Sequence, residues 1–451
     1  MKRVLLVSSN TCREPSPVYP LGLAVVAAAL AGSGHRVEQF DFLACGESEE
    51  TFRGKMIEFD PDFVCISVRN LDNCDSRNPL GYTGTAKRLV EAVRRTSAAP
   101  VIIGGPGFSL LPEEMLAATG ADYGIVGEGE RLIRDLIRDL SNGARPASPL
   151  LRGERFLSGE EIPSPLYSGE LIGYYMNQGG MCNLQTKRGC PYRCAYCSYP
   201  VLEGNRFRCR EPGAVADDME RAGTDHGVSS FFIADSIFND REGHYLSVAE
   251  EILRRRLPVR WCCFMRPDGV GRKEIALLKR AGLYAAELGT DASSDAALDA
   301  LGKGFMFAQV LEANRAFNAE RVPCAHFVMF GGPGETVETV SEGLANLGQL
   351  ENTVVFAYSG IRILPGTALH ARAVAEGLLR PGSPLLEPVY YHSPGIDPEE
   401  MHRMIAGAFR GNRRRFFPPA EGLDRLKVMH DFGYRGLLWD HLIRYPGGPA
   451  C

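Results

Sequence analysis

Residues 187–197 read Lys-Arg-Gly-Cys-Pro-Tyr-Arg-Cys-Ala-Tyr-Cys, so Cys190, Cys194 and Cys197 have the spacing Cys-x3-Cys-x2-Cys. Three thiolates on one short loop can hold three irons of a four-iron four-sulfur cubane and leave the fourth iron without a protein ligand. That iron is an open coordination site for a substrate or a cofactor. The alternatives are a chance grouping or a structural zinc ion, which normally requires a fourth cysteine or histidine. Cys182 and Cys209 are close enough in sequence to be considered for that role.

Residues 181–380, which surround this loop, alternate strand and helix signals. The alternation predicts a partial (β/α) barrel of parallel strands, with the cysteine loop after the first strand. Residues 381–451 contain helical candidates at 398–410 and 419–432, and they predict a small helical cap. After a first strand that includes Leu184, we expect barrel strands at 230–233, 260–264, 284–288, 326–330 and 354–358.

Residues 1–140 alternate short apolar runs with helical stretches, which predicts a doubly wound parallel sheet covered by helices on both faces. Ligands of such sheets bind at the carboxyl ends of the strands. Asn70, Gly104 and Gly105 fall in loops at those ends, and we expect a ligand crevice there, although glycine in these loops would equally serve tight turns. Residues 141–180 are rich in Pro, Gly and Ser, and we expect a linker that runs over the surface. Strands are expected at 4–7, 37–42, 63–68, 101–103 and 123–126, and helices at 21–31 and 86–95.

The bulk composition is that of an ordinary globular enzyme of two or three domains. The chain has 451 residues, and 50 Lys+Arg against 55 Asp+Glu give a net charge of −5, which favours neither nucleic acid nor an anionic membrane as a partner. No apolar run resembles a signal peptide or a membrane span, and we expect a cytoplasmic protein with reduced thiols. We interpret the cysteines outside the loop as small buried hydrophobic residues without a functional role.

The cysteine loop, with the aromatic Tyr196 just before its last cysteine, resembles the signature of radical S-adenosylmethionine (SAM) enzymes. The resemblance implies that Cys190, Cys194 and Cys197 bind a 4Fe-4S cluster. It also implies that reductive cleavage of SAM gives a 5'-deoxyadenosyl radical, which abstracts hydrogen from the substrate. Segments 232–239, 287–291 and 331–336 are similar to cofactor-binding segments of that family.

These similar segments imply roles for individual residues. Tyr196 would pack on adenine through its backbone, and Gly331 and Gly332 would let the main chain approach SAM closely. Asp235 and Glu287 could instead cap a helix or end a strand in solvent. The full set of implied SAM-binding residues is Tyr196, Asp235, Asn239, Glu287, Thr290, Gly331 and Gly332.

Residues 1–140 resemble the cobalamin-binding domain that precedes the barrel in one large subclass of radical SAM enzymes. The matching segments are 20–23, 104–106 and 126–130. The resemblance implies a cobalamin-binding-like Rossmann fold, in which Asn70, Gly104 and Gly105 contact cobalamin. Two departures stand out: there is no Asp-x-His-x-x-Gly motif, and Phe108 follows Gly107 where a histidine commonly follows Gly-Gly-Pro. Either cobalamin binds without a histidine of this domain, or the domain has kept its fold and lost the cofactor.

Together the resemblances imply cobalamin-dependent C-methylation of a small metabolite of natural-product type. The alternative is a cobalamin-independent radical dehydration or deoxygenation of a diol in an aminoglycoside-type substrate, with a vestigial N-terminal domain. A non-catalytic cobalamin or iron-sulfur binding protein is disfavoured by the intact cysteine motif. RNA methylthiolation is disfavoured because extra upstream cluster cysteines and a basic tail are absent from the sequence. The expected partners are a small-molecule substrate and an electron donor such as flavodoxin or ferredoxin, without nucleic acid or membrane.

Overall fold

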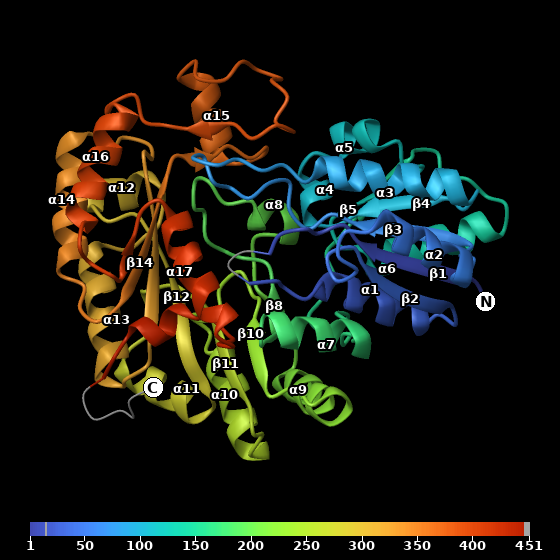
Figure 1. Ribbon diagram of the computed structural model, residues 1–451, viewed down its shortest axis with the longest axis horizontal. Coiled ribbons are helices and arrows are strands. Elements are labelled where there is room, and N and C mark those ends of the chain that lie inside the picture. The colour runs from blue at the N-terminus through green and yellow to red at the C-terminus, as the bar shows by residue number, and fades with distance from the viewer. Residues whose placement is uncertain (14–15, 446–451) are drawn as a thin grey trace.

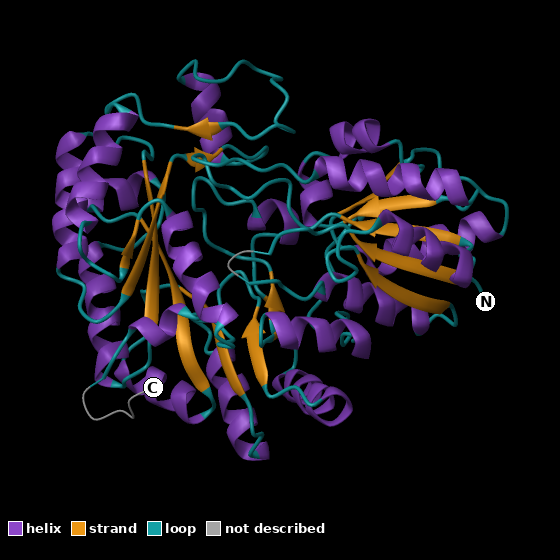
Figure 2. Cartoon of the chain, in the orientation of Figure 1, coloured by secondary structure: helices purple, strands orange, loops and turns teal. Residues whose placement is uncertain are grey.

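The computed structural model describes residues 1–13 and 16–445, and it contains two large parallel sheets side by side (Figure 1). The last residues of the expected C-terminal cap, 446–451, lie outside the described residues. The carboxyl ends of the strands of the first sheet face the second sheet (Figure 2). The two domain folds expected from the sequence are thus both present, and the loops at the end of one sheet lie against the other.

The N-terminal sheet has the strand order β2-β1-β3-β4-β5-β6, and all its paired strands are parallel. Its two faces are covered by separate clusters of buried apolar side chains, one with α2 and α3 and one with α1 and α6. Burial on both faces explains why residues 4–7 of β1 form a continuous apolar run rather than an alternating one. The strands are β1 Arg3–Ser8, β2 Arg36–Asp41, β3 Phe63–Ser67, β4 Val101–Gly104, β5 Tyr123–Val126 and β6 Leu150–Arg152; the helices are α1 Leu21–Ala31, α2 Glu49–Phe59, α3 Thr83–Thr96, α4 Pro106–Leu110, α5 Pro112–Thr119 and α6 Gly129–Ser141.

The segment 141–180 is not only a surface linker, and this part of the sequence-based expectation is wrong. Strand β6 extends the N-terminal sheet by pairing with β5, and helix α7 (Gly169–Gln178) buries Leu171, Ile172 and Tyr175. The Tyr175 hydroxyl donates to Asp41 Oδ2 at 3.0 Å. The short apolar pair in β6 gains its stability from the open edge of β5, which the Pro- and Gly-rich composition of the segment does not reveal.

The second sheet, here the barrel sheet, has the strand order β17-β14-β13-β12-β11-β10-β7 with parallel pairing throughout. The predicted partial barrel is confirmed. Two small antiparallel pairs, β8 with β9 and β15 with β16, lie beside it. The strands are β7 Cys182–Leu184, β8 Lys187–Arg188, β9 Arg208–Cys209, β10 Ser230–Ile233, β11 Arg260–Met265, β12 Leu283–Asp291, β13 Cys324–Phe330, β14 Val354–Ser359, β15 Ile361–Arg362, β16 Tyr390–Tyr391 and β17 Arg415–Phe416.

Helices cover the outer face of the barrel sheet, and the C-terminal segment packs on the inner face. Alternate residues of the central strands, such as Cys263 and Leu288, lie in the outer layer under the helices. Their neighbours in the chain, such as Cys262, pack with Leu426 and Trp439 of the C-terminal segment. The helices are α8 Tyr199–Glu203, α9 Pro212–His226, α10 His244–Arg255, α11 Arg272–Arg280, α12 Asp295–Ala300, α13 Phe307–Ala319, α14 Val337–Gly348, α15 Ala368–Ala375, α16 Pro398–Phe409, α17 Pro419–Asp431 and the 3₁₀-helix η1 Trp439–Leu442.

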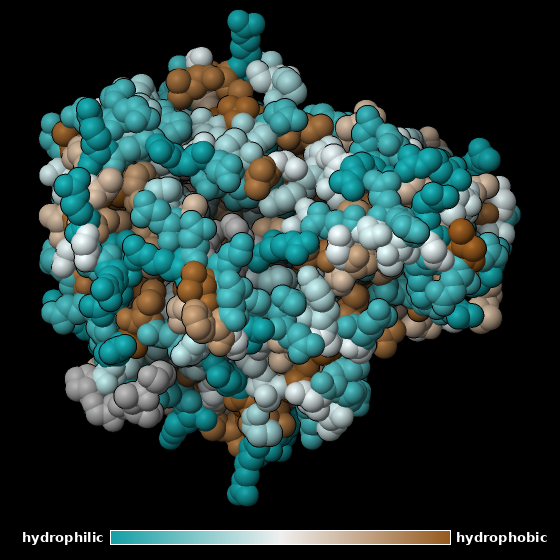
Figure 3. Space-filling model, in the orientation of Figure 1, coloured by the Kyte–Doolittle hydropathy of each residue, from teal (hydrophilic) through white to brown (hydrophobic). Residues whose placement is uncertain are grey.

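Hydrophilic residues cover most of the face shown in the space-filling view, and apolar residues form small separate patches (Figure 3). In the described part of the chain, no helix combines the length and apolar character that a membrane crossing requires.

Candidate functional site

The cysteine loop follows β8 at the side of the barrel sheet that faces the N-terminal domain. The Cys190 thiol is buried, and those of Cys194 and Cys197 are half-buried. Burial, with the thiols of Cys194 and Cys190, raises the pKa of Cys197 to about 12. Among residues 1–13 and 16–445, no three His, Cys, Asp or Glu side chains converge as ligands of a single metal ion. A cubane takes one thiol per iron, and three neighbouring thiols on one loop are the donor set that it requires.

Hydrogen bonds from its backbone anchor the cysteine loop at two places, the end of α8 and the end of α12. Cys190 N donates to Gly204 O at 3.1 Å, and Gly189 N donates to Glu203 Oε2 at 3.0 Å. Ala195 N donates to Leu301 O at 2.9 Å. Gly189 has φ +84°, and a Cβ there would lie 2.1 Å from the carbonyl oxygen of Arg206, so this position requires glycine. The loop is therefore held in place by the protein itself.

Two buried cations lie near the cysteines, and the sequence patterns did not reveal either of them. The Arg266 side chain forms an ion pair with Asp268 at 2.7 Å, and Lys303 forms one with Asp291. Burial raises the pKa of Cys190, and the charge of Arg266 opposes that rise; Lys303 opposes the corresponding rise at Cys197. Positive charge beside a thiol favours the thiolate, which is the form that binds iron.

The structure uses the polar atoms of three predicted SAM-binding residues within the protein. Asp235 accepts hydrogen bonds from the backbone of Thr186 and Lys187, and burial raises its pKa to about 6. Asn239 bonds the backbone of Arg266, and the Thr290 hydroxyl lies 2.8 Å from His326 Nδ1. These contacts give Asp235, Asn239 and Thr290 structural roles, and their contacts to SAM stay predictions.

The turn 331–335 is also closed internally. Gly332 N donates to Glu335 Oε2 at 2.7 Å, and burial raises the pKa of Glu335 to about 7 against the backbone donors of Gly332 and Gly331. Gly331 has φ +86°, and a Cβ there would lie 3.3 Å from His392 Nδ1. The glycine at this position is thus explained by the backbone turn and by His392, and the close approach of SAM stays a prediction.

The side chains of two further predicted SAM-binding residues, Tyr196 and Glu287, lie in different parts of the barrel. The Tyr196 hydroxyl donates to Asp291 Oδ2 at 2.6 Å beside the cysteine loop. Glu287 lies on the inner face of the barrel sheet, where Trp439 Nε1 donates to Oε1 at 3.1 Å. Burial raises the pKa of Glu287 to about 7, against the hydrogen bond from Trp439.

The raised pKa of Glu287 predicts a pH-dependent stability difference. A glutamate whose pKa rises from 4.5 to about 7 on folding contributes stability that is complete below about pH 4.5 and is lost as the pH rises through 7. Glu287→Gln stays neutral, so its free energy of unfolding should increase relative to that of the unmodified protein between about pH 5 and about pH 8. Urea unfolding at the two pH values measures this difference. Glu91→Gln, at an exposed position of α3, is the control. If the stability difference between Glu287→Gln and the unmodified protein changed no more with pH than that of the control, the raised pKa of Glu287 would be contradicted.

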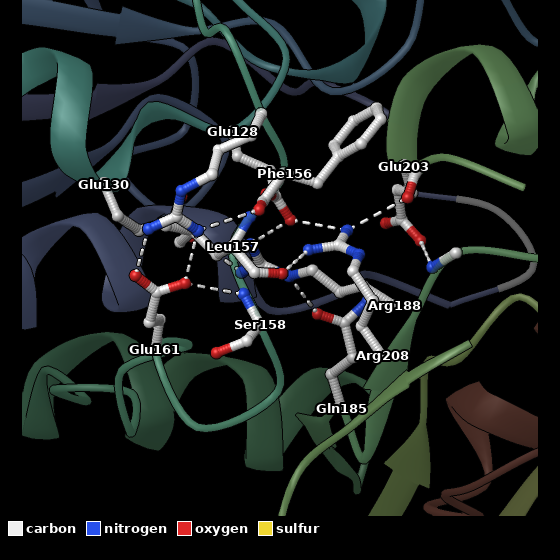
Figure 4. A network of polar contacts seen from close by, with 12 residues as sticks. Glu128, Glu130, Phe156, Leu157, Ser158, Glu161, Gln185, Arg188, Glu203 and Arg208 are labelled. Atoms are coloured by element: carbon white, nitrogen blue, oxygen red, sulfur yellow. Dashed lines mark hydrogen bonds and ion pairs between the residues drawn. The ribbon is translucent and has the colours of Figure 1, made fainter. Parts of the chain in front are cut away.

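Loops of the N-terminal domain contact the barrel through buried ion pairs. Glu128, which follows β5, accepts from Arg188 at 3.0 Å and from Arg208 at 2.7 Å, and Glu130 accepts from Arg188 at 2.6 Å (Figure 4). Arg188 leads directly into Gly189 and the first cysteine. The β5–α6 connection and the cysteine loop are therefore joined by charges that lie out of solvent, where removing one partner is costly.

A second buried ion pair joins the loop after β3 to the end of the barrel sheet. Arg362 Nε, on β15, donates to Asp72 Oδ2 at 2.7 Å, and both side chains are buried. In the β1–α1 loop, Tyr19 N donates to Asn183 Oδ1 of β7 at 3.1 Å. Loops after β1, β3 and β5 thus all contact the barrel.

The predicted cobalamin-contacting residues lie in these same loops. A Cβ on Gly105, which has φ +101°, would lie 2.5 Å from the carbonyl oxygen of Val68. A Cβ on Gly107 would lie 2.8 Å from the backbone of Asn70. The glycines let the loops after β3 and β4 pack backbone against backbone, with Gly104 at the end of β4. His35 is the one histidine in residues 1–140 of the sequence. It lies before β2, where its Nδ1 accepts a hydrogen bond from Lys2 N. The domain therefore fits cobalamin that is bound without a histidine of this domain.

Phe108 fills the core and does not line the edge of the sheet. It is fully buried, and a Cβ on Gly124 of β5 would lie 2.3 Å from its ring. The structure assigns it to the core, so it does not obstruct the loops at the carboxyl edge.

Phe108→Leu should therefore lower the free energy of unfolding by on the order of 1 kcal/mol, because it leaves part of a packed site empty. Cobalamin affinity of the folded protein should stay the same. Denaturant unfolding and a spectroscopic cobalamin titration measure the two quantities. Phe432→Leu, at a position that is 81% exposed, is the matched control and should change neither. A loss of cobalamin affinity at unchanged stability would place the Phe108 ring at the ligand instead.

Comparison with known proteins agrees with this architecture. Residues 14–137 match the family model of the B12 binding domain, and residues 184–345 match that of the radical SAM superfamily. The tryptophan 2-C-methyltransferase of Streptomyces laurentii is 27% identical over 449 residues, which cover 83% of this chain and 74% of that protein.

Two solved structures resemble the whole chain. TsrM from Kitasatospora setae, a radical SAM methyltransferase with cobalamin and a 4Fe-4S cluster bound, gives a TM-score of 0.85 at 24% identity, and the match covers 98% of this chain and 97% of TsrM. OxsB, a cobalamin-dependent radical SAM enzyme with aqua-cobalamin and SAM bound, gives 0.72 at 18% identity, over 90% of this chain and 66% of OxsB. At these identities the likeness concerns the fold. The two expected domain types and their order are confirmed.

Proposed function

Since the chain is a radical SAM enzyme with an N-terminal B12-binding domain, we propose that it catalyses the cobalamin-dependent methylation of a carbon atom in a small molecule. One observation carries the proposal: the carboxyl edge of the cobalamin-type sheet lies directly against the cysteine loop and the barrel. Ligands of open parallel sheets bind at that edge. A cofactor bound at the carboxyl edge of the N-terminal sheet would therefore lie next to a cofactor bound by the cysteine loop.

The residues divide the work between the two cofactors. Cys190, Cys194 and Cys197 would hold the cluster, and the loops with Asn70 and with Gly104 and Gly105 would hold cobalamin. When bound, the cluster supplies the electron that cleaves SAM, and cobalamin supplies a methyl carrier. The buried pairs of Glu128 with Arg188 and Arg208 fix the relative position of the two loops, because breaking either would leave a buried charge alone. The protein thus positions two reactive groups toward one substrate.

We further propose that a flavodoxin- or ferredoxin-type protein supplies the electron. Three exposed arginines surround the cysteine loop: Arg193 within it, Arg206 beside Gly189, and Arg241, whose guanidinium lies 6.0 Å from the Tyr192 ring. Positive charge around the loop, in a chain of net charge −5, suits an acidic redox partner.

The test of methylation needs no knowledge of the substrate. The full-length protein is reconstituted anaerobically with iron, sulfide and hydroxocobalamin, and is then given a reductant and SAM with a deuterated methyl group. We expect stoichiometric cobalamin and transfer of the labelled methyl group to it, measured by mass spectrometry. Protein that binds the cluster and cleaves SAM but retains no cobalamin would overturn the proposal. That result would favour the dehydration of a diol, whose product has lost one water and gained no methyl group.

A further inference from the structure

The inner face of the barrel sheet is accessible at its centre. Phe264 is 39% exposed although it lies on β11, an interior strand of the sheet, and Phe232, Phe327 and Tyr358 on other strands of the same sheet are half-buried. Residues that alternate with them, such as Cys263 and Ala357, are fully buried under the helices. Side chains in the centre of a filled barrel would be buried as well. Phe232, Phe327 and Tyr358 pack in part against the C-terminal segment, and Phe264 is the most accessible ring of this aromatic face.

Glu287 is a buried carboxylate on this inner face, which also carries Arg260 against the Tyr284 ring. Glu287 pairs in register with Phe264 on one side and with Ala325 on the other, and the next residue of β12 on the same face is Gly289. The buried Trp439 donates a hydrogen bond from Nε1 to Glu287 Oε1 at 3.1 Å. The indole thus holds the carboxylate in place.

Glu287 has no cationic partner within the described residues, whereas the buried carboxylates Asp72, Asp240 and Asp268 each pair with an arginine or lysine. A buried carboxylate without a compensating charge or a second donor is costly. Such groups occur where a ligand completes the interaction. One oxygen is bound by Trp439, and a ligand on the aromatic face can supply a donor to the other.

We propose that Glu287 and the aromatic residues around it form the substrate-recognition surface, and that it selects a planar aromatic substrate bearing a proton on nitrogen. The proposal rests on the function proposed above and adds the substrate class. The rings of Phe232, Phe264, Phe327 and Tyr358 pack against the flat substrate, and Glu287 accepts its N–H. Trp439 is a positioning residue, since it holds the carboxylate and does not touch the substrate. The nitrogen can be a neutral ring N–H or a protonated amine.

Binding of simple probes to the reconstituted full-length protein tests the proposal. Indole, 1-methylindole, benzylamine and toluene are titrated by calorimetry. A probe with a nitrogen-bound proton should bind about tenfold more tightly than its counterpart without one, as expected for a hydrogen bond to a charged group. Indole over 1-methylindole indicates the neutral N–H, and benzylamine over toluene indicates the protonated amine.

Two variants assign the preference to Glu287. Glu287→Leu removes the acceptor and should abolish both preferences. Glu287→Gln keeps an acceptor but no charge, so a preference for indole should largely persist and one for benzylamine should disappear. Glu335→Gln is the matched control, because Glu335 is also buried without a cationic partner but lies in the turn after β13, and it should leave the preferences unchanged.

The outcomes separate this proposal from the proposed function. Equal affinities within each probe pair, no binding of any probe, or preferences that persist in Glu287→Leu would overturn it. The methyl-label experiment does not involve these probes. Normal labelling of cobalamin with failed probe binding therefore rejects only the substrate class, and failed labelling with the expected probe preferences rejects only the methylation.

Discussion

Replacing Cys190, Cys194 and Cys197 together by alanine should abolish cluster binding and 5'-deoxyadenosine formation while leaving the fold intact. The three thiols lie on a loop whose position depends on backbone bonds to Gly204, Glu203 and Leu301, and not on the sulfur atoms. A loss of activity of at least about a thousandfold is expected, because the cluster supplies the electron for SAM cleavage. Iron and sulfide analysis, circular dichroism and product chromatography measure these effects.

The double variant Cys182→Ala and Cys209→Ala is the control, and it also tests the zinc alternative. Cys182 is buried on β7, and Cys209 is half-buried on β9. Neither should be needed for the cluster, so the control should keep its iron and its SAM cleavage. A triple variant with normal iron content, or a control that loses its metal, would contradict the assignment of the three cysteines.

The sequence predicted those parts of the fold that depend on local pattern. The helix 21–31 and the strand 230–233 occur with the predicted bounds, because both are apolar runs set off by Pro, Gly or polar residues. Strand β6 and helix α7 were missed, because β6 is only three residues long and α7 lies in a segment rich in Pro, Gly and Ser; both gain stability from β5 and from the neighbouring core. Long-range packing of this kind leaves little periodic signal.

Individual site residues could be predicted only by type. Asp235 and Asn239 are polar residues at the end of β10, which favours a ligand-binding role, yet both bind backbone groups of this chain. A buried polar side chain needs a hydrogen-bond partner, but the sequence around it does not show which group is that partner. The predicted contact of Glu287 to SAM stays a prediction, and the structure adds a hydrogen bond from Trp439, 152 residues later in the chain. No local pattern could connect the two.

Lys187→Met should lower the free energy of unfolding by about 3–5 kcal/mol, the usual cost of leaving one partner of a buried ion pair alone. Lys187 is fully buried in β8, and its Nζ donates to Asp240 Oδ2 at 2.7 Å and to Phe238 O at 2.6 Å. Burial alone would raise the pKa of Asp240, but the charge and hydrogen bond of Lys187 hold it below its ordinary value. Without the lysine, Asp240 is a buried carboxylate that has lost its ion-pair partner.

The double variant Lys187→Met and Asp240→Asn separates the charge from the packing. If the cost of Lys187→Met comes from the orphaned carboxylate, removing that charge should restore most of the stability, since replacing a buried pair by neutral groups is often nearly neutral. Urea unfolding of the two single variants and the double variant closes the cycle. Because β8 leads directly into Cys190, iron retention should fall in Lys187→Met and recover in the double variant. Equal destabilisation of all three variants would mean that Lys187 acts through its packing, and that the buried charge beside the cysteine loop has no part in holding it.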